Sequence, residues 1–405
     1  MRAPDIVIIG GGPAGLMAAE CLATAGRRVT IYDGMATVGR KFLMAGRGGL
    51  NLTHSQPPSA FVTNYGAAQP WFERYLARFS PDDLRAWAEG LGIATTIGSS
   101  GRVFPVPAKA SPLLRAWLGR LGRLGVTFRT RHHWQGIDEN GANLIVAPDG
   151  TLIAVRADAT VLALGGASWP RLGSTGSWVE PLRRRGVTVT ALEPANCGFE
   201  TDWSAWFRER NEGRPLKNLG VHFDGRMIRG DLVVTRYGLE GGPIYSHGPA
   251  LRAAIARGGA AVIHLDLRPQ LSVEALTQRL QRPRGAASWS TWIHKTLNLA
   301  PPFPALLRDT IVMDVLDDPH GLAATIKALP VALLAPRPLE RAISTAGGIA
   351  FSALTDDLML TAIEGCFACG EMLEWEAPTG GYLLQGCFST GVWAADGVER
   401  WLQRQ

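Results

Sequence analysis

The stretch "DIVIIGGGPAGLMAAECLATAG", residues 5–26, constrains the fold more than any other part of this chain. It opens with a short run rich in β-branched apolar residues, which is typical of a strand buried on both faces of a parallel sheet. Gly10, Gly12 and Gly15 follow in the spacing G-x-G-x-x-G, and a helical pattern begins directly after them. The stretch therefore predicts a strand, a tight turn and a helix whose free N-terminal N–H groups can bind a phosphate.

The residues after this helix supply the rest of a dinucleotide-binding unit. Gly26 ends the helix, "RRVTIYD" predicts a second strand, and Asp33 closes that strand 21 residues after Gly12. An acid at this place can accept hydrogen bonds from the 2′-hydroxyl of a ribose. Because strand, glycine turn, helix, strand and acid occur in this order, we favour a Rossmann fold over a glycine-rich turn that binds nothing.

The segment "GRKFLMAGRGGLNLTH", residues 39–54, favours FAD over NAD. It places Arg40 and Lys41 ahead of a glycine cluster that leads into Asn51. Cationic side chains can bind phosphates, and glycines let the backbone approach a flat neutral ring closely. We therefore expect one loop that follows FAD from its phosphates to the flavin. The sequence has no second complete G-x-G-x-x-G, which leaves NAD(P)H as a candidate transient electron donor only.

Composition limits the remaining classes of protein. The chain has 405 residues, of which 46% are hydrophobic and 19% charged, as expected of a folded protein with two or three domains. Its apolar runs are too short for a transmembrane helix or a signal peptide, so we expect a cytoplasmic protein that does not bind membranes. The net charge of +6 is not concentrated in blocks, which argues against a nucleic-acid partner and favours a small-molecule substrate.

The pattern along the chain predicts a discontinuous cofactor domain. Residues 1–190 would form its first part and residues 342–405 its second part, where glycine-rich stretches return. Between them, residues 191–341 contain short strand patterns such as "VHFDG" and "LVVTRYG", and helical patterns at about 270–330. We expect this middle part to be an inserted substrate or cap domain.

Local signals predict several elements in the first part. "PDDLRAWAEGLG" has Ser80 as an expected helix N-cap, and "SPLLRAWLGRLGRLG" is expected to start from Ser111. Between these helices, "GRVFPVPAKA" has the prolines of an irregular loop. "VTFRTRHHWQGI" predicts a strand, in which His132 and His133 are framework residues rather than catalysts.

The C-x-x-C formed by Cys366 and Cys369 has two interpretations. The spacing occurs in thiol redox motifs and in halves of zinc sites. However, "GCFACGE" has the pattern of a buried strand, and no second pair of cysteines or histidines completes a metal site in the sequence. We favour a structural role and expect no metal.

Several stretches together carry a resemblance to a known family. They are "IVIIGGGPAGLMAA", "GRKFLMAGRGGLNLTH", "TRYGLEGGPIY", "TAGGIAF" and "CGEMLEWEAPTGGYLLQGCFSTG". In this order they resemble the BaiN-like flavoproteins, a family of NAD(P)/FAD-dependent oxidoreductases that includes the aminoacetone-oxidase-family enzymes. The resemblance implies a glutathione-reductase-type FAD-binding Rossmann fold of the α/β class, with an inserted β-barrel plus helical domain.

The resemblance also implies which residues bind FAD. Gly10, Gly12, Ala14 and Gly15 would contact the pyrophosphate, Asp33 the adenosine ribose, Arg40 and Lys41 the ribose and phosphate region, Asn51 the flavin side, Trp134 the adenine through its backbone, Gly165 and Gly166 the adenine side, Gly370 and Glu371 the ribityl chain, and Gly381, Tyr382 and Leu383 the isoalloxazine. Two places depart from the family pattern. Gly49 and Leu50 stand where many members have Arg-Cys, and "LEWEAPTGGY" replaces an Asp-rich turn.

The catalytic groups remain open. Candidates for a proton donor near a substrate are His54, Tyr237, Glu240, His247 and Tyr382, each of which could equally be a framework residue. The favoured activity is hydride transfer through flavin N5 to or from a small organic substrate, an enoate or steroid-like acid or an amine. The alternatives are a flavoprotein that acts on tRNA and a non-catalytic flavin-binding module.

Overall fold

The chain divides into two compact units, each with its own hydrophobic core. This computed structural model describes residues 5–46, 48–310 and 318–405. The discontinuous unit comprises Met1–Pro194 and Ile343–Gln405, and the inserted unit comprises Ala195–Ala342. Within the described residues, no helix is both long and apolar enough to span a bilayer.

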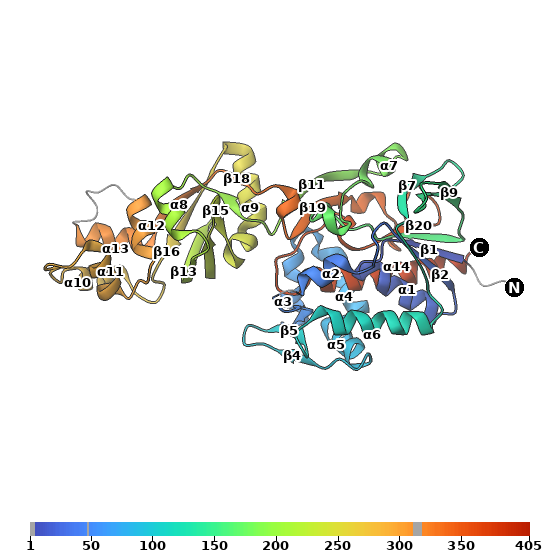
Figure 1. The fold of residues 1–405 in the computed structure, drawn as a ribbon, viewed down its shortest axis with the longest axis horizontal. Coiled ribbons are helices and arrows are strands. Elements are labelled where there is room, and N and C mark those ends of the chain that lie inside the picture. Colours follow the sequence, from blue (N-terminus) through green and yellow to red (C-terminus); the bar gives the residue numbers. More distant parts are fainter. Residues whose placement is uncertain (1–4, 47, 311–317) are drawn as a thin grey trace. The chain divides into compact units, whose positions relative to one another are not determined.

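A five-stranded parallel sheet forms the centre of the discontinuous unit (Figure 1). Its strand order is β20-β10-β1-β2-β6, and the central strand β1 is buried because four of its five residues are apolar and inaccessible. The register places Ile8 of β1 opposite Ile31 of β2 and Val161 of β10. The strands are β1 (Asp5–Ile9), β2 (Arg28–Asp33), β6 (Thr127–Thr130), β10 (Ala159–Leu162) and β20 (Cys366–Ala368).

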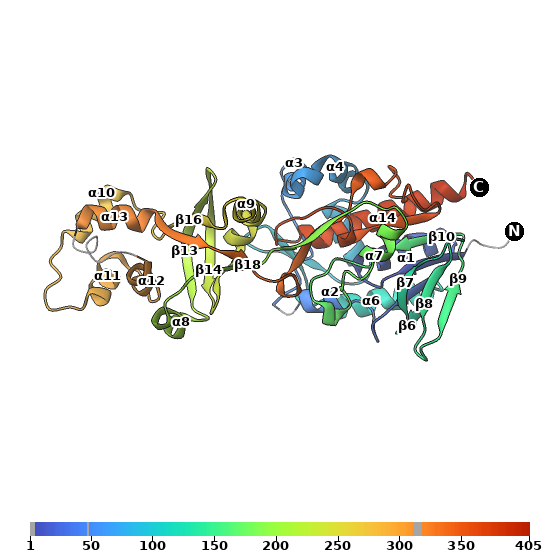
Figure 2. The same ribbon diagram turned by 90° about the horizontal axis from the view of Figure 1, so that it is seen from above.

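Two helices pack closely beside this sheet (Figure 2). Helix α1 (Pro13–Thr24) connects β1 to β2, and α14 (Tyr382–Leu402) follows β20. Their backbones approach so closely that a Cβ at Gly391 would lie 2.5 Å from the carbonyl oxygen of Ala14. The predicted order of strand, turn, helix and strand is therefore confirmed.

Smaller elements surround the sheet. Three-stranded antiparallel sheets are formed by β7-β8-β9 and by β3-β5-β4, and β11 pairs with β19. The remaining elements of this unit are α2 (Arg40–Ala45), β3 (Thr53–His54), α3 (Pro58–Val62), η1 (Thr63–Ala68), α4 (Gln69–Arg78), α5 (Pro81–Glu89), β4 (Thr95–Ile97), β5 (Arg102–Pro105), α6 (Ala110–Arg123), β7 (His133–Ile137), β8 (Asn143–Val146), β9 (Leu152–Val155), η2 (Pro170–Leu172), α7 (Val179–Arg184), β11 (Val189–Ala195), β19 (Ser344–Ile349), η5 (Phe351–Ala353) and η6 (Gly370–Met372).

The two predicted helix starts have different outcomes. Ser80 caps α5 as predicted, because its hydroxyl accepts the N–H of Asp83 and the Asp83 carboxylate accepts the N–H of Ser80. The start of α6 was placed wrongly at Ser111, since the helix begins at Ala110 without a side-chain cap. Ala110 is buried against Gly46, where a Cβ would come within 2.6 Å of the Ala110 Cβ. Tertiary packing thus overrides the local capping signal.

Three further local predictions were wrong. The segment 39–54 is not one loop, because α2 occupies its first half. The proline-containing stretch before α6 includes β5, which tolerates Pro105 at its last position. The expected single strand around the two histidines is two strands, β6 and β7, separated by Arg131 in the left-handed conformation and by His132.

The inserted unit contains a closed antiparallel barrel. Its strand order is β17-β16-β13-β14-β15-β12-β18. The two edge strands, β17 and β18, are consecutive in the sequence and are separated only by Leu334. The Leu334 N–H donates to the Glu200 carbonyl oxygen at 2.8 Å. One nearly continuous strand therefore joins both edges of the sheet. The strands are β12 (Phe199–Glu200), β13 (Pro215–Phe223), β14 (Arg226–Val234), β15 (Gly238–Glu240), β16 (Ala261–Asp266), β17 (Leu329–Leu333) and β18 (Ala335–Pro336).

Helices lie on two sides of the strands of this barrel. Helix α9 lies on one side, and α10, α11, α12 and α13 gather on the other (Figures 1 and 2). Apolar residues of the barrel and of these four helices form one continuous core. The helices are α8 (Ala205–Asn211), α9 (Gly242–Gly258), α10 (Val273–Leu280), α11 (Trp289–Leu297), α12 (Phe303–Thr310) and α13 (Pro319–Lys327), with the short η4 (Leu339–Arg341) after the barrel. The expected fold class, a Rossmann fold with an inserted β-barrel and helices, is confirmed.

Candidate functional site

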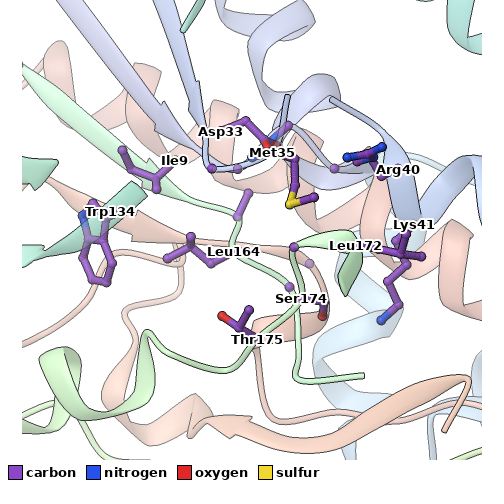
Figure 3. A pocket seen from close by; sticks show the side chains of 18 of the residues that line it. Ile9, Asp33, Met35, Arg40, Lys41, Trp134, Leu164, Leu172, Ser174 and Thr175 are labelled. Atoms are coloured by element: carbon purple, nitrogen blue, oxygen red, sulfur yellow. The ribbon is translucent and has the colours of Figure 1, made fainter. Parts of the chain in front are cut away.

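A cavity of about 420 Å³ lies at the carboxyl-terminal edge of the parallel sheet (Figure 3). Its walls include residues that directly follow four adjacent strands, at positions 10–14, 34–35, 163–165 and 369–371. Ligands of open parallel sheets bind outside the carboxyl ends of the strands. The cavity is therefore the primary candidate site of the discontinuous unit.

The cavity differs in chemistry along its length. Figure 3 shows Trp134 at one end and Lys41 at the other, with Leu164 and Ser174 between them. Arg40 lines the wall close to Lys41. An aromatic end thus faces a cationic end across the cavity.

The glycines at the three positions of the G-x-G-x-x-G motif have different structural roles. A Cβ at Gly10 would lie 2.3 Å from the Ala163 carbonyl oxygen, and one at Gly15 would lie 2.0 Å from the Gly10 carbonyl oxygen. Both glycines are therefore required for close backbone packing. At Gly12, which lines the cavity, an added Cβ would meet no protein atom within 4 Å. The space beside Gly12 is open to a ligand at the uncapped N-terminus of α1.

Asp33 lies in the cavity wall at the end of β2. Its two carboxylate oxygens accept the backbone N–H groups of Gly11 at 2.8 Å and Met35 at 2.7 Å. Burial raises the pKa of Asp33, and these two hydrogen bonds oppose the shift. Each oxygen keeps a second lone pair, so the carboxylate can still accept hydrogen bonds from a bound ligand.

An ion pair joins the two sequence segments of this unit at the cationic end. The Lys41 ammonium lies 2.7 Å from a carboxylate oxygen of Glu371 and 2.6 Å from the hydroxyl of Ser168. The other Glu371 oxygen accepts the N–H of Thr345 at 3.0 Å. The sequence predicted both charged residues for the site, and the structure places them in contact with one another.

A second group of predicted residues gathers at the start of α14. A Cβ at Gly381 would lie 2.5 Å from the Thr53 backbone, so the chain after Asn51 lies directly against the first turn of this helix. The amide oxygen of Asn51 is buried and has no hydrogen-bond partner among the described residues. Cys387 lines the cavity and lies five residues after Tyr382 in α14. The first residue of this helix is therefore about 7 Å along the helix axis from the part that lines the cavity.

His54 and Tyr382 form part of the local framework. Their rings stack with centroids 5.5 Å apart. His54 Nδ1 accepts the N–H of Gln56 at 3.2 Å, so Nε2 carries the proton that the carbonyl oxygen of Ser100 accepts at 3.0 Å. The Tyr382 hydroxyl donates to the Gln56 side chain at 2.6 Å. Because both nitrogens of His54 are bound locally, this histidine has no free group for a substrate.

Other sequence candidates lie elsewhere. Of the cofactor residues, Gly15 and Gly166 pack against protein, the latter against Thr345. Tyr237, Glu240 and His247 belong to the inserted unit. His247 is buried at 2% exposure, its Nε2 lies 3.2 Å from the Val221 carbonyl oxygen, and burial lowers its pKa. This histidine is a framework residue of α9.

Sequence reasoning missed one wall of the cavity. Residues 170, 172–175 and 177 line it, and the Ser174 hydroxyl there is buried without a hydrogen-bond partner among the residues that the structure describes. The sequence feature that could have indicated this wall is "GSTG" in "RLGSTGSW", where glycines flank two hydroxyl residues. His132 and His133, which we expected to be framework residues, also line the cavity.

Cys197, Cys366 and Cys369 are buried, and Cys21 and Cys387 are partly buried. Burial raises the pKa of Cys366 and Cys369, and it raises the pKa of Cys387 to about 12. A thiol with a raised pKa is a poor nucleophile and a poor metal ligand. The described residues contain no group of His, Cys, Asp and Glu side chains that could hold a metal ion.

Comparison with known proteins assigns the chain to a family. The model of the HI0933-like protein Rossmann domain matches residues 4–397, so the chain belongs to that family. This confirms the resemblance to the BaiN-like flavoproteins and the expected enzyme class, a flavin-dependent oxidoreductase.

Relatives of known activity share the whole length of the chain. It is 23% identical to the 3-dehydro-bile acid delta(4,6)-reductase of Clostridium scindens, over 96% of this chain and 97% of the relative. It is 25% identical to the ribosomal RNA dihydrouridine synthase of Escherichia coli, over 96% of each chain. Among solved structures, the 3-ketosteroid-delta4-(5alpha)-dehydrogenase of Rhodococcus jostii RHA1 has the same fold, with a TM-score of 0.52 at 16% identity over 99% of this chain and 97% of that one.

Proposed function

We propose that this protein binds FAD and uses it to reduce a carbon–carbon double bond conjugated to a carbonyl group. The observation that carries FAD binding is the cavity at the strand ends, which is open beside Gly12, has an acid at Asp33 and has cations at Arg40 and Lys41. The buried unpartnered oxygens of Asn51 and Ser174 support a polar ligand that completes their hydrogen bonds.

Each part of the site has a role in this proposal. The N-terminus of α1 and the side chain of Arg40 bind the pyrophosphate, because both favour negative charge. Asp33 accepts hydrogen bonds from the adenosine ribose, and the backbone at Trp134 lies against the adenine. The ribityl chain lies near Gly370 and Glu371, and the flavin lies near Asn51 and the first turn of α14. FAD would supply the two-electron chemistry, and the protein would orient it.

The names of the relatives support the proposed substrate class. A 3-dehydro-bile acid with a Δ4 double bond, or with Δ4 and Δ6 double bonds together, contains an alkene conjugated to the C3 ketone. The double bond that is lost when uridine becomes dihydrouridine is conjugated to a ring carbonyl. A 3-ketosteroid Δ4-dehydrogenase forms such a double bond in the reverse direction. Reduction next to a carbonyl is the chemistry that these substrates share, and none of these names supports amine oxidation.

The electron balance is that of a conjugate reduction. A hydride is added to the β carbon, the electron pair of the double bond shifts toward the carbonyl oxygen, and the α carbon takes a proton from water. The product is the saturated carbonyl compound, and bound reduced FAD would supply the hydride. An external two-electron donor would have to supply the electrons for the next turnover, and NADH and NADPH are the first donors to test.

A substrate panel tests this proposal. The purified holoprotein is reduced anaerobically by dithionite and mixed with a 3-oxo-4-ene steroid, fumarate or uridine-containing RNA, and the flavin absorbance is followed. We expect the conjugated ketone to reoxidise the flavin. Reoxidation by RNA alone would favour the second candidate, a uridine reductase, which the identity to the dihydrouridine synthase supports. Reduction of the oxidised flavin by amines, with no reaction of any alkene, would contradict the proposal.

A further inference from the structure

We propose that Glu371 couples occupation of the cofactor cavity to the order of β11 and β19, the strand pair at which the chain leaves and re-enters the discontinuous unit. This inference rests on the proposed binding of FAD and concerns the regulation of that same site. The chain leaves the unit after Pro194 in β11 and returns to it at Ile343, directly before β19. Strand β19 contains most of the stretch "TAGGIAF", to which the candidate cofactor site gives no role.

Two glycines of this stretch bring β19 close to both β11 and the cofactor site. A Cβ at Gly347 would lie 2.0 Å from the carbonyl oxygen of Ala191 in β11. A Cβ at Gly348 would lie 2.5 Å from the carbonyl oxygen of Met372 in η6. Glu371, which directly precedes Met372, lines the cavity. The backbone of β19 is therefore in close contact with the partner strand and with the segment that borders the cofactor.

Glu371 joins the cavity to β19 through its carboxylate. One oxygen accepts the N–H of Thr345 in β19 at 3.0 Å, and the other lies 2.7 Å from the Lys41 ammonium. The Thr345 hydroxyl in turn accepts the N–H of Ala167 at 2.9 Å, so the chain after β10 is bound to the same residue. Thr345 is fully buried, whereas the Glu371 side chain is 12% exposed. A single carboxylate thus reaches from the cavity wall to a buried residue of β19.

This carboxylate can respond to a ligand in the cavity. Its two oxygens have about four lone-pair sites, and the contacts with Thr345 and Lys41 use two of them. A hydroxyl of the ribityl chain can therefore donate to Glu371 without displacing either partner. The added hydrogen bond restricts the carboxylate, and a restricted carboxylate pays less entropy to keep its bond to the Thr345 N–H.

The coupling acts in both directions by thermodynamic necessity. If bound FAD stabilises the contact between Glu371 and β19, a change that disrupts β19 must weaken FAD binding by the corresponding factor. Couplings between two sites of a protein typically amount to about 5- to 150-fold in affinity. The cofactor site is thereby linked to the two points where the chain enters and leaves the inserted unit.

Hydrogen exchange of the full-length protein tests the first direction. Mass spectrometry follows the peptides that cover residues 189–195 and 343–349, with and without a saturating concentration of FAD. We expect FAD to slow their exchange about 5-fold or more in wild type, and to change it by no more than about twofold in Glu371→Ala. Arg40→Ala is the control, because it changes another cavity residue and leaves the bond between Glu371 and Thr345 in place. It should weaken FAD binding and keep the full effect once saturated.

The affinity for FAD tests the reverse direction. Gly347→Ala forces β11 and β19 apart through its contact with the Ala191 carbonyl oxygen, although neither residue lines the cavity. We expect it to weaken FAD binding about 5-fold or more. Gly397→Ala is the matched control, since its Cβ would lie 2.2 Å from the Asp357 carbonyl oxygen, ten residues beyond the part of α14 that lines the cavity. It should bind FAD within about twofold of wild type.

The outcomes separate this inference from the proposed function. Equal exchange of residues 343–349 in wild type with and without FAD would overturn the coupling, as would an unreduced FAD effect in Glu371→Ala or wild-type FAD affinity of Gly347→Ala. If Gly347→Ala does not fold, the exchange of wild type and Glu371→Ala decides. Neither measurement uses a substrate, so a protein that shows the coupling and reduces no conjugated ketone contradicts the proposed reduction alone.

A protein that binds no FAD would contradict the proposed function at its first step. The exchange of the free protein then decides on the contact between Glu371 and β19. Faster exchange of residues 343–349 in Glu371→Ala than in wild type supports this contact, and equal exchange refutes it.

Discussion

At the scale of single residues, the discontinuous unit contains buried hydrogen-bonding atoms that its described residues do not satisfy. The Ser174 hydroxyl and the Asn51 amide oxygen are buried and unpartnered among the described residues, whereas most buried polar groups of folded proteins have partners. Asp33, in contrast, is already fixed by two backbone N–H groups. The unsatisfied atoms are the places where a bound cofactor would change the free energy most.

Replacing Ser174 tests this directly. We expect Ser174→Ala to weaken FAD binding about 10-fold, because one hydrogen bond to the cofactor is lost. The apoprotein should keep its thermal stability, since this hydroxyl forms no hydrogen bond with the described part of the chain. Fluorescence titration of the apoprotein with FAD measures the effect, and Ser99→Ala, at an exposed serine, is the control. Equal affinity of the Ser174 variant and wild type would contradict the assignment.

His247 should make the stability depend on pH. Burial lowers its pKa, with Arg226 and His222 acting in the same direction, while its hydrogen bond to the Val221 carbonyl oxygen opposes the shift. Below the unfolded pKa of about 6.5 the unfolded chain therefore binds a proton that the native state excludes. The free energy of unfolding should fall as the pH decreases from about 7 to 5.

The control for this pH effect lies in the same barrel. Urea unfolding of His247→Gln across this range should show a weaker pH dependence than wild type. His264→Gln, at an exposed position of β16, should retain the wild-type dependence. Identical pH profiles for wild type and His247→Gln would show that His247 does not exclude the proton.

At the scale of elements, the turn between β1 and α1 contains one glycine that close packing requires and another that borders the space for a ligand. Gly15 is required by the protein itself, because its Cβ would overlap the Gly10 carbonyl oxygen at 2.0 Å. Gly12 has an extended backbone with φ of −83° and faces open space, so the protein alone tolerates a side chain there. The two glycines of one motif thus have different physical roles.

A matched pair of substitutions distinguishes these roles. Gly15→Ala should lower the stability of the apoprotein by about 1–3 kcal/mol or more, since backbone atoms must move. Gly12→Ala should leave the apoprotein as stable as wild type and weaken FAD binding, because its methyl group occupies the ligand space. Thermal unfolding of both apoproteins and FAD titration provide the two measurements. An apoprotein destabilised equally by both substitutions would refute the separation.

The helix caps give a second matched pair. Ser80→Ala removes the hydroxyl that accepts the Asp83 N–H at the start of α5 and should cost about 1 kcal/mol. Ser111→Ala should cost little, because Ser111 lies inside α6 and caps nothing. Denaturant unfolding compares the two variants, and equal losses would show that the capping box does not contribute.

These elements also show how far sequence reasoning reaches. The strand, glycine turn and helix at the N-terminus were predictable because their signal is local and each residue has one physical reason. The start of α6 was not, because contact of Ala110 with Gly46 decides it. Ser174 was missed since its role depends on the fold, which brings residues 170–178 to the ends of β1 and β10. The contact between Lys41 and Glu371 likewise joins residues far apart in the sequence.

At the scale of the whole molecule, the two units have separate cores. The core of the inserted unit runs from the barrel into α10–α13, and the barrel closes on itself through the strand around Leu334. A closed barrel has no open strand edges that need a partner. Each unit therefore contains the contacts for its own stability.

The inserted unit should fold alone. Residues 195–342, expressed as a separate chain, are expected to give a cooperative thermal transition and dispersed amide resonances. The reason is that the barrel and its helices bury one continuous apolar core within this range. A chain without a cooperative transition would show that the inserted unit depends on the rest of the protein.

The most direct test of the proposed function is one anaerobic turnover with product analysis. The holoprotein is reduced with dithionite, freed of excess reductant and mixed with 4-androstene-3,17-dione, and the reoxidised flavin and the steroid product are quantified together. We expect FAD to be released on denaturation and one saturated ketone to form for each flavin reoxidised. A reduced flavin that persists with the conjugated ketone, or a protein that cannot be loaded with FAD, would contradict the proposal.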